Sequence, residues 1–246
     1  MIKLNQGKWR KEGERMRIKK ILVSLLIGGV VMTSGCSQIE KQKQQKVRNE
    51  VEQEFYKLDT VYPTSSLEEL MEKFPGKEIQ INHFVTKKQE EGKIYSYYMS
   101  FKIDKEKNIT GKVEVEDTTE TLSIKLNEYN LVYNKKTKKF EREDGEKVDD
   151  VVKNIKFLFQ MLDVKNNPLK DWNNTYARSI ENINSYSLVY EINNEEISKY
   201  IGFENSEIKL HLSGSDRLFI DGDIGTFQIS NKNSKERLLE GILIKN

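Results

Sequence analysis

A short apolar stretch near the N-terminus divides this chain of 246 residues into a leader and a larger remainder. Ile21 to Met32 is apolar over about a dozen residues, fewer than the roughly 20 that a transmembrane helix needs. The basic segment Met16 to Lys20 precedes it, and the small residues Thr33, Ser34 and Gly35 follow. This order is typical of a secretory signal peptide, so only the remainder is expected to fold.

The chain has one cysteine, Cys36, which directly follows the small residues. A lone cysteine forms no internal disulfide, and in an exported protein it indicates modification or pairing with another molecule. The segment resembles the lipobox of bacterial lipoproteins, in which the cysteine sulfur receives a diacylglycerol and the leader is removed. The resemblance implies cleavage between Gly35 and Cys36, although Thr33 stands where the usual lipobox has leucine. Two long acyl chains such as palmitate would anchor the protein, because each buried CH₂ adds about 0.8 kcal/mol of membrane affinity.

Two other fates of the leader remain open: a signal anchor with an incidental cysteine, and free secretion. The start of translation is open as well. Residues 1–15 are hydrophilic and precede a complete basic region, so we expect translation to begin at Met16 rather than at Met1.

Removing the leader changes the sign of the net charge. Residues 1–35 hold eight of the 41 Lys and Arg residues and two of the 39 Asp and Glu residues. The remainder therefore carries 33 basic and 37 acidic residues, a net charge of −4. A mildly acidic chain gives no reason to expect a nucleic-acid partner.

Beyond the cysteine, the sequence indicates a tether followed by a folded domain. Residues 36–46 are rich in Gln and Lys with little apolar content, which indicates a solvated, lipidated tether. Residues 47–246 are expected to form an α+β lipoprotein domain. Residues 47–140 and 148–246 are candidate halves of similar design, each a helix followed by a meander of strands.

Apolar residues recur at helical spacing in two places and predict helices over 44–59 and 148–163. Ser66 and Glu69 form a capping box that opens a shorter helix from Leu67 to Phe74. Another short helix is expected near Glu195 to Tyr200.

Strands account for most of the remaining pattern. Apolar and polar residues alternate from Tyr95 to Ile103, which predicts a half-buried strand. Further short strands are expected at 113–115, 122–126, 131–133, 186–192, 208–212, 218–220, 227–229 and 242–244. Runs of strands separated by a helix favour antiparallel sheets with packed helices in an α+β fold.

Few residues suit metal binding or catalysis. His211 alternates onto the polar face of its strand, and His83 has no second His or Cys nearby to complete a metal site. The segment Asp221 to Gly225 lacks the third acidic ligand and the final Glu of a calcium loop, so a hairpin turn is favoured over calcium binding there. Ser213 to Asp216 is predicted to be a turn on the same grounds. No nucleophile elbow, P-loop or dinucleotide motif is present. We therefore expect no enzymatic activity, no metal and no cofactor.

Tyrosines are the side chains best suited to protein contact. They lie on expected strands, and Tyr98 should point away from its neighbours Tyr95 and Tyr97, so that one face bears an exposed ring. Tyr186 and Tyr190 lie on a later strand. Core packing is the expected role of most of them.

Several segments in colinear order resemble the staphylococcal tandem-type lipoproteins. The matching segments are Leu58 to Pro63, Ser66 to Leu70, Asn154 to Phe159, Ser187 to Asn194, Leu212 to Ser215 and Gly225 to Ser230. The tryptophan-containing segment of that family has no counterpart in Glu72 to Gly92. The resemblance implies a Gram-positive surface lipoprotein and surface antigen of undefined biochemistry, associated with host interaction and with immune recognition of its lipid.

Together these observations predict a protein anchored by diacylglycerol on Cys36 to the extracellular face of the cell membrane. Its domain is expected to bind a protein partner, from the host or the envelope, without catalysis. One alternative is a binding module for a small ligand or envelope component, which would need an apolar pocket between sheet and helix. A less favoured alternative is a hydrolase, which would need converging acids or an activated serine.

Overall fold

The computed structural model describes residues 41–180, 185–203, 207–215, 223–231 and 235–245. The leader, Gly35 and Cys36 therefore lie outside the described residues. Residues 47–246 form one compact unit. Residues 41–46, at the end of the expected tether, are helical and exposed.

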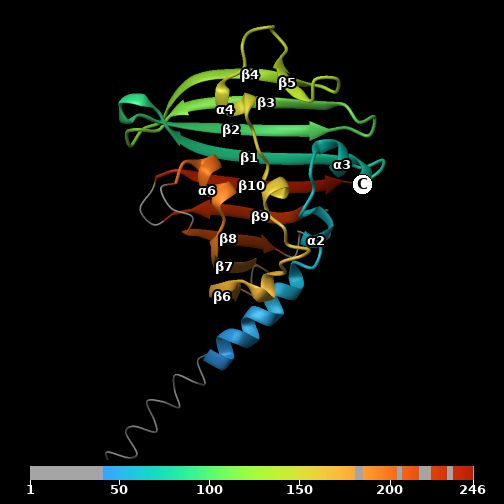
Figure 1. Cartoon of the computed structure of the whole chain (residues 1–246), viewed down its shortest axis with the longest axis vertical. Helices are drawn as coiled ribbons and strands as arrows, with labels where there is room; N and C mark the ends of the chain where they lie inside the picture. The colour runs from blue at the N-terminus through green and yellow to red at the C-terminus, as the bar shows by residue number, and fades with distance from the viewer. Residues whose placement is uncertain (1–40, 181–184, 204–206, 216–222, 232–234, 246) are drawn as a thin grey trace, which may run out of the picture. The chain divides into compact units, whose positions relative to one another are not determined.

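Ten described strands form a single antiparallel sheet in the order β5-β4-β3-β2-β1-β10-β9-β8-β7-β6 (Figure 1). The strands are β1 (Glu78–Lys88), β2 (Ile94–Ile103), β3 (Ile109–Asp117), β4 (Ile124–Asn134), β5 (Lys139–Arg142), β6 (Asn173–Ile180), β7 (Ser185–Asn193), β8 (Glu207–Ser215), β9 (Asp223–Ser230) and β10 (Arg237–Lys245). The fold is therefore mixed α+β and mostly sheet, as the order of helices and strands predicts. It contains one large sheet where the sequence suggested several.

The chain forms two meanders that run in the same direction across the sheet. Strands β1 to β5 run from the middle of the sheet to one edge, and β6 to β10 run from the other edge back to the middle. There β10 pairs with β1, with Phe84 opposite Leu239. The shared direction of the two meanders does not by itself confirm a structural repeat of 47–140 and 148–246.

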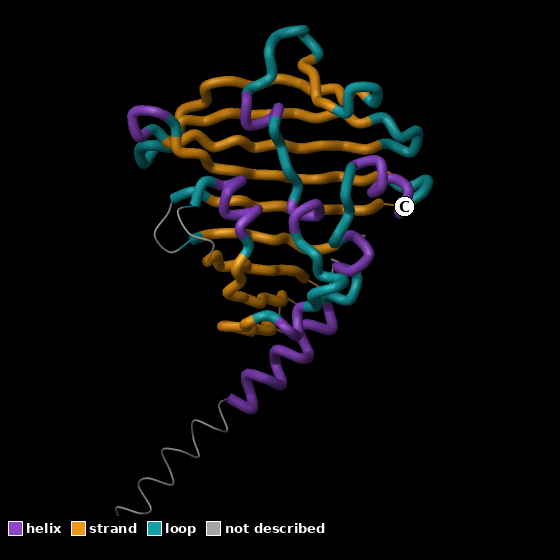
Figure 2. The backbone as a smooth tube through the Cα atoms, viewed as in Figure 1, coloured by secondary structure: helices purple, strands orange, loops and turns teal. Residues whose placement is uncertain are grey.

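Helical segments pack on one face of the sheet, which we call the covered face (Figure 2). Apart from a helix over residues 47–54, they are α2 (Leu58–Val61), α3 (Leu67–Lys73), α4 (Asp150–Lys153), α5 (Leu158–Met161), η2 (Leu169–Asp171) and α6 (Glu195–Ile201). A further turn, η1 (Glu90–Gly92), joins β1 to β2. The segment between β5 and β6 crosses this face from one edge of the sheet to the other (Figure 1).

The segment expected to form one helix from 44 to 59 is helical only to residue 54. It then forms a turn that leads into α2. The capping box predicted at the start of α3 is confirmed in one half: Ser66 caps the helix, but the Glu69 side chain bonds Ser65 instead of Ser66. The Glu69 backbone N–H donates to the Ser66 hydroxyl at 3.2 Å, and the Glu69 carboxylate accepts from the Ser65 N–H at 2.6 Å. These contacts satisfy N–H groups that have no partner within the first turn of a helix.

The single helix predicted over 148–163 is wrong. The chain forms α4 and α5, separated by residues that include Phe157 in an extended conformation with φ −85° and ψ 149°. The cause lies in the sheet, where the Glu240 carboxylate accepts the backbone N–H groups of Leu158 and Phe159 at 2.8 and 3.2 Å. Those two N–H groups therefore cannot take part in a continuous helix, because in a helix they would donate to carbonyl oxygens four residues earlier.

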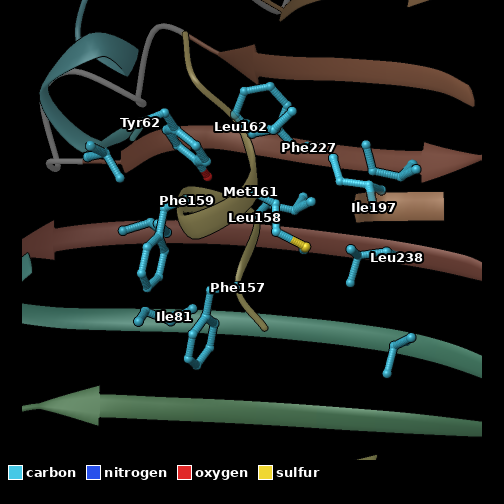
Figure 3. Close-up of a cluster of buried hydrophobic side chains, with 14 of the residues drawn as sticks. Tyr62, Ile81, Phe157, Leu158, Phe159, Met161, Leu162, Ile197, Phe227 and Leu238 are labelled. Atoms are coloured by element: carbon cyan, nitrogen blue, oxygen red, sulfur yellow. The ribbon is translucent and has the colours of Figure 1, made fainter. Parts of the chain in front are cut away.

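The crossing segment supplies the apolar filling between helices and sheet. Phe157, Leu158, Phe159 and Met161 project from α5 towards the central strands (Figure 3). The rings of Phe157 and Phe159 stack at 5.0 Å, and Phe157 meets Phe101 of β2 edge to face at 5.3 Å. Aromatic pairs of this geometry stabilise a core by about 0.5–1.5 kcal/mol beyond the area they bury. An apolar pocket at this place, which a small-ligand binding module would need, is filled by protein side chains.

Three described strands were not expected, and one predicted turn is wrong. No strand was expected at β1, β5 or β6. Ser213 to Ser215, predicted as a turn, continue β8, because Gly214 pairs with Tyr186 and extends the ladder along β7. Asp216, the strand expected at 218–220 and the first residues of the Asp221 to Gly225 segment lie outside the described residues.

Candidate functional site

The face of the sheet away from the helices, which we call the uncovered face, has its own side-chain pattern. Residues directly opposite each other in antiparallel strands point to the same side. One cross-strand row on this face runs Tyr176, Val189, His211, Gln228, Leu239, Phe84, Tyr98, Glu114, Glu128. We call it the central row; it changes from polar to apolar to acidic as it crosses the sheet.

The middle of the central row is an aromatic cluster made of Phe84, Tyr98 and Leu239. The Phe84 and Tyr98 rings lie 4.7 Å apart between centroids, with Leu239 opposite Phe84. Tyr98 remains 45% exposed, which is high for a ring at the centre of a sheet. Burial and the nearby carboxylates of Glu116 and Glu114 raise the pKa of the Tyr98 hydroxyl, so it stays protonated at neutral pH.

The neighbouring row, which we call the small-residue row, is built mostly from short polar side chains. It runs Ser187, Ser213, Thr226, Gly241, Asn82, Ser100, Lys112, Asn130. A Cβ added at Gly241 would approach the Thr226 hydroxyl to 3.2 Å. The short side chains leave a hollow of about 530 Å³ beside the aromatic cluster, lined among others by Asn82, Ser100 and Lys112.

Charged residues flank the aromatic cluster on β3 and β4. Lys112 pairs with Glu128, and Lys125 bridges Glu128 and Glu114, the latter at 3.4 Å. The hydrogen bonds from Lys112 and Lys125 lower the pKa of Glu128 to about 2. An exposed ring with adjacent apolar surface and a charged border has the composition of protein–protein contact surfaces.

His211 lies on the uncovered face, as its alternation with Lys209 predicts. It is half-buried, and its Nε2 lies 2.7 Å from the Ser187 hydroxyl. Burial lowers the pKa of the His211 imidazole, which favours the neutral ring. Within the described ranges no carboxylate is hydrogen-bonded to His211, so the pair lacks the orienting acid of a Ser-His-Asp triad there.

Most tyrosines that were candidates for partner contact serve the covered face instead. Tyr97 and Tyr190 are buried, and Tyr95 and Tyr186 pack against the core. Tyr98 points to the opposite side from Tyr97, as predicted.

Three tyrosines on strands attach covering segments to the sheet. Each donates its hydroxyl hydrogen bond to a carboxylate on such a segment: Tyr190 to Glu52 at 2.9 Å, Tyr133 to Glu68 at 2.7 Å, and Tyr129 to Asp149. Burial first, and then the carboxylate, raises the pKa of each tyrosine hydroxyl.

His83 is fully buried and pairs with Glu240 rather than with any metal ligand. Its Nδ1 lies 3.1 Å from the Glu240 carboxylate, which is also fully buried. Glu240 accepts the Tyr62 hydroxyl at 3.3 Å in addition to the Leu158 and Phe159 N–H groups. Glu240 was not identified from the sequence. Its one distinguishing feature there is an acidic side chain at a position of the strand Arg237–Lys245 that faces the core.

The described part of the chain contains no cluster of three or more His, Cys, Asp or Glu residues that could hold a metal ion. Among the described helices, none has the length and apolar character required to span a bilayer.

The fold defines an α+β protein with a large antiparallel sheet, one face of which carries the described helices. The chain is similar to an uncharacterized lipoprotein of Staphylococcus epidermidis, with 28% identity over 249 aligned positions. The alignment covers 89% of this chain and 88% of that protein. No family model matches the chain. The similarity fits a staphylococcal lipoprotein and does not single out the tandem type.

Proposed function

We propose that the chain is a lipoprotein held on the extracellular face of a Gram-positive cell membrane, with a non-enzymatic domain that binds a protein partner through the uncovered face. The aromatic cluster of Phe84, Tyr98 and Leu239 is the observation that carries the binding role. The other face is occupied by the protein's own helices, so a partner meets the sheet from the side of this cluster. Its charged border of Lys112, Lys125 and Glu128 supplies orientation and specificity more than affinity.

The anchor in this proposal is a diacylglycerol on Cys36, with cleavage after Gly35. The order of basic, apolar and small residues supports it, and so does the alignment to a staphylococcal lipoprotein over most of both chains. In a Gram-positive host, Cys36→Ala should give an unprocessed precursor that takes up no labelled palmitate. Continued labelling of that variant would contradict the anchor while leaving the binding role untouched.

The binding role is tested on intact cells with a photo-crosslinking amino acid at position 98. We expect crosslinks to a defined partner, because side chains at this position face solvent at the centre of the uncovered face. The same probe at Tyr56, which is 64% exposed and lies outside the sheet, is the matched control. Equal crosslinking from both positions, or none from position 98, would refute the proposed surface.

A small ligand or envelope component is a second candidate, favoured by the hollow beside the aromatic cluster. It would contact Asn82 and Ser100 at the base of the hollow. Paired Asn82→Ala and Ser100→Ala substitutions should abolish binding of such a ligand. A protein partner that depends on the exposed Tyr98 ring should tolerate both substitutions and lose affinity with Tyr98→Ala.

A further inference from the structure

A second hollow lies on the covered side, where the end of β1 meets α4 and α6. Its volume is about 460 Å³, and Lys87 of β1 and Tyr200 of α6 contribute to its lining. It is separate from the hollow on the uncovered face, because neighbouring positions of β1 such as Lys87 and Thr86 point to opposite sides of the sheet.

Lys87 is a partly buried cation that has no carboxylate partner at short range. Its Nζ lies 4.7 Å from the centroid of the Tyr200 ring, a cation–π contact. Among the described residues no carboxylate oxygen lies within ion-pair distance of it, and Glu236 acts on it only at longer range. By contrast, Lys156 in the same hollow is paired with Glu196 at 2.6 Å. A desolvated ammonium without an anion is costly, and an anionic ligand would remove that cost.

Tyr200 is held in place by a polar chain that leads into the core. Its hydroxyl lies 3.4 Å from Nε2 of His83, and Nδ1 of His83 lies 3.1 Å from the Glu240 carboxylate. The ring that carries Lys87 is thereby fixed before any ligand arrives. A preformed contact of this kind reduces the ordering cost of binding.

The charged groups at the hollow, Lys87 included, balance one another. The others are Asp150 from α4, Lys156 from the segment after it, and Glu196 and Lys199 from α6, with Glu236 near the end of β1. Lys156 is paired with Glu196, which leaves Lys87 and Lys199 facing Asp150, with Glu236 acting on Lys87 at longer range.

We propose that this hollow binds a small oxyanion, the phosphate or carboxylate group of a small molecule, on the ammonium of Lys87 above the Tyr200 ring. The site is independent of the proposed contact surface on the other face.

The ionisation of Lys87 gives the site a pH dependence. Burial lowers the pKa of Lys87 to about 8, partly opposed by Glu236. Binding requires the ammonium, so affinity is full below pH 8 and falls by about tenfold per pH unit well above it. A bound oxyanion favours the charged form and raises the pKa of Lys87.

The test measures acetylation of individual lysines by trace acetic anhydride at pH 8, read by peptide mass spectrometry on the full-length protein in non-ionic detergent. Inorganic phosphate and acetate are compared with chloride at equal ionic strength. We expect phosphate, acetate or both to slow acetylation of Lys87 at least several-fold more than chloride does, and to leave Lys156 unaffected. Protection by one anion alone identifies the group that the site takes. If neither anion protects Lys87 beyond chloride, the proposal is overturned.

A direct binding measurement uses ³¹P line broadening of inorganic phosphate, or calorimetry with acetate, according to which anion protects. Lys87→Met should abolish the signal and Lys87→Arg should retain it. Lys88→Met is the matched control, because Lys88 is the exposed next residue of the same strand. Equal loss in Lys87→Met and Lys88→Met would show that only general surface charge attracts the anion.

Discussion

The two faces of the sheet use the same residue types for opposite purposes. On the covered face, carboxylates such as Glu240 and Glu52 accept hydrogen bonds from tyrosines and backbone groups that they hold in place. On the uncovered face, Glu114 and Glu128 pair with lysines in solvent, and Tyr98 leaves much of its ring exposed. The comparison shows that the polar contacts of the covered face are mostly buried, whereas those of the uncovered face are exposed to solvent.

The largest expected difference between the faces concerns Glu240. Replacing it by leucine removes the acceptor of two buried N–H groups and the partner of His83, and should lower the free energy of unfolding by about 3–5 kcal/mol. Urea denaturation followed by circular dichroism measures the change. Glu128→Leu is the control on the uncovered face and should leave the unfolding curve almost unchanged. Similar losses in both variants would remove the distinction between the faces.

A smaller effect is expected from single tyrosine hydroxyls. Tyr190→Phe deletes the hydrogen bond to Glu52 in the core and should cost about 1.5–3 kcal/mol, the range for bonds to charged groups. Tyr98→Phe is the counterpart on the uncovered face, where no described residue bonds the hydroxyl, and it should be neutral. The midpoint of urea denaturation reports both. A neutral Tyr190→Phe would mean that the attachment of the N-terminal helix does not depend on this bond.

Two glycines, Gly111 on β3 and Gly241 on β10, provide another comparison of the two faces. A Cβ at Gly111 would lie 2.8 Å from the Phe101 ring in the core, so Gly111→Ala should cost about 1–3 kcal/mol through overpacking. A Cβ at Gly241 would lie 3.2 Å from the Thr226 hydroxyl and 4.0 Å from the Gly225 carbonyl oxygen, on the uncovered face. Gly241→Ala should therefore cost less than Gly111→Ala, as measured by thermal unfolding. If Gly241→Ala destabilised the protein more than Gly111→Ala, the tighter packing would lie on the uncovered face, which would contradict the comparison.

The smallest expected effect is a change in acid sensitivity. Burial raises the pKa of Glu68, but hydrogen bonds led by that from Tyr133 outweigh it and hold the pKa below the usual 4.5. A carboxyl with a lowered folded-state pKa stabilises the protein above its unfolded-state pKa, and this contribution is lost as pH falls through the folded-state value. Tyr133→Phe should therefore reduce the loss of stability below pH 4.5. The interval from pH 7 to pH 3 includes the titration of Glu68. If the free energies of unfolding of the unmodified protein and of Tyr133→Phe fall in parallel over this interval, the prediction is contradicted.

Local patterns predicted the parts of the fold that depend on neighbours in the sequence. The alternation from Tyr95 to Ile103 identified β2 because one face of that strand is buried and the other is not. The capping box identified α3 for the same local reason. Residues 148–163 could not be predicted in this way, because Glu240 captures the backbone of α5 from 82 residues away.

The sequence predicted the candidate sites less well than it predicted the fold. The aromatic cluster joins β10, β1 and β2, and only the pairing of the last strand with the first brings Leu239 beside Phe84. Alternation alone correctly placed Tyr98 on the side opposite Tyr97. The partner of His83 lies 157 residues away, and spacing arguments look for ligands much nearer in the chain.

The pairing of β1 with β10 makes completion of the sheet depend on the final strand in chain order. β1 is formed from residues 78–88 and keeps one side unpaired until residues 237–245 are available. A chain that is released early or nicked before β10 lacks both this strand and Glu240, and it exposes β1 as an open edge of the kind that promotes aggregation. A chain without β10 therefore has an unpaired strand edge in the middle of what is otherwise one continuous sheet.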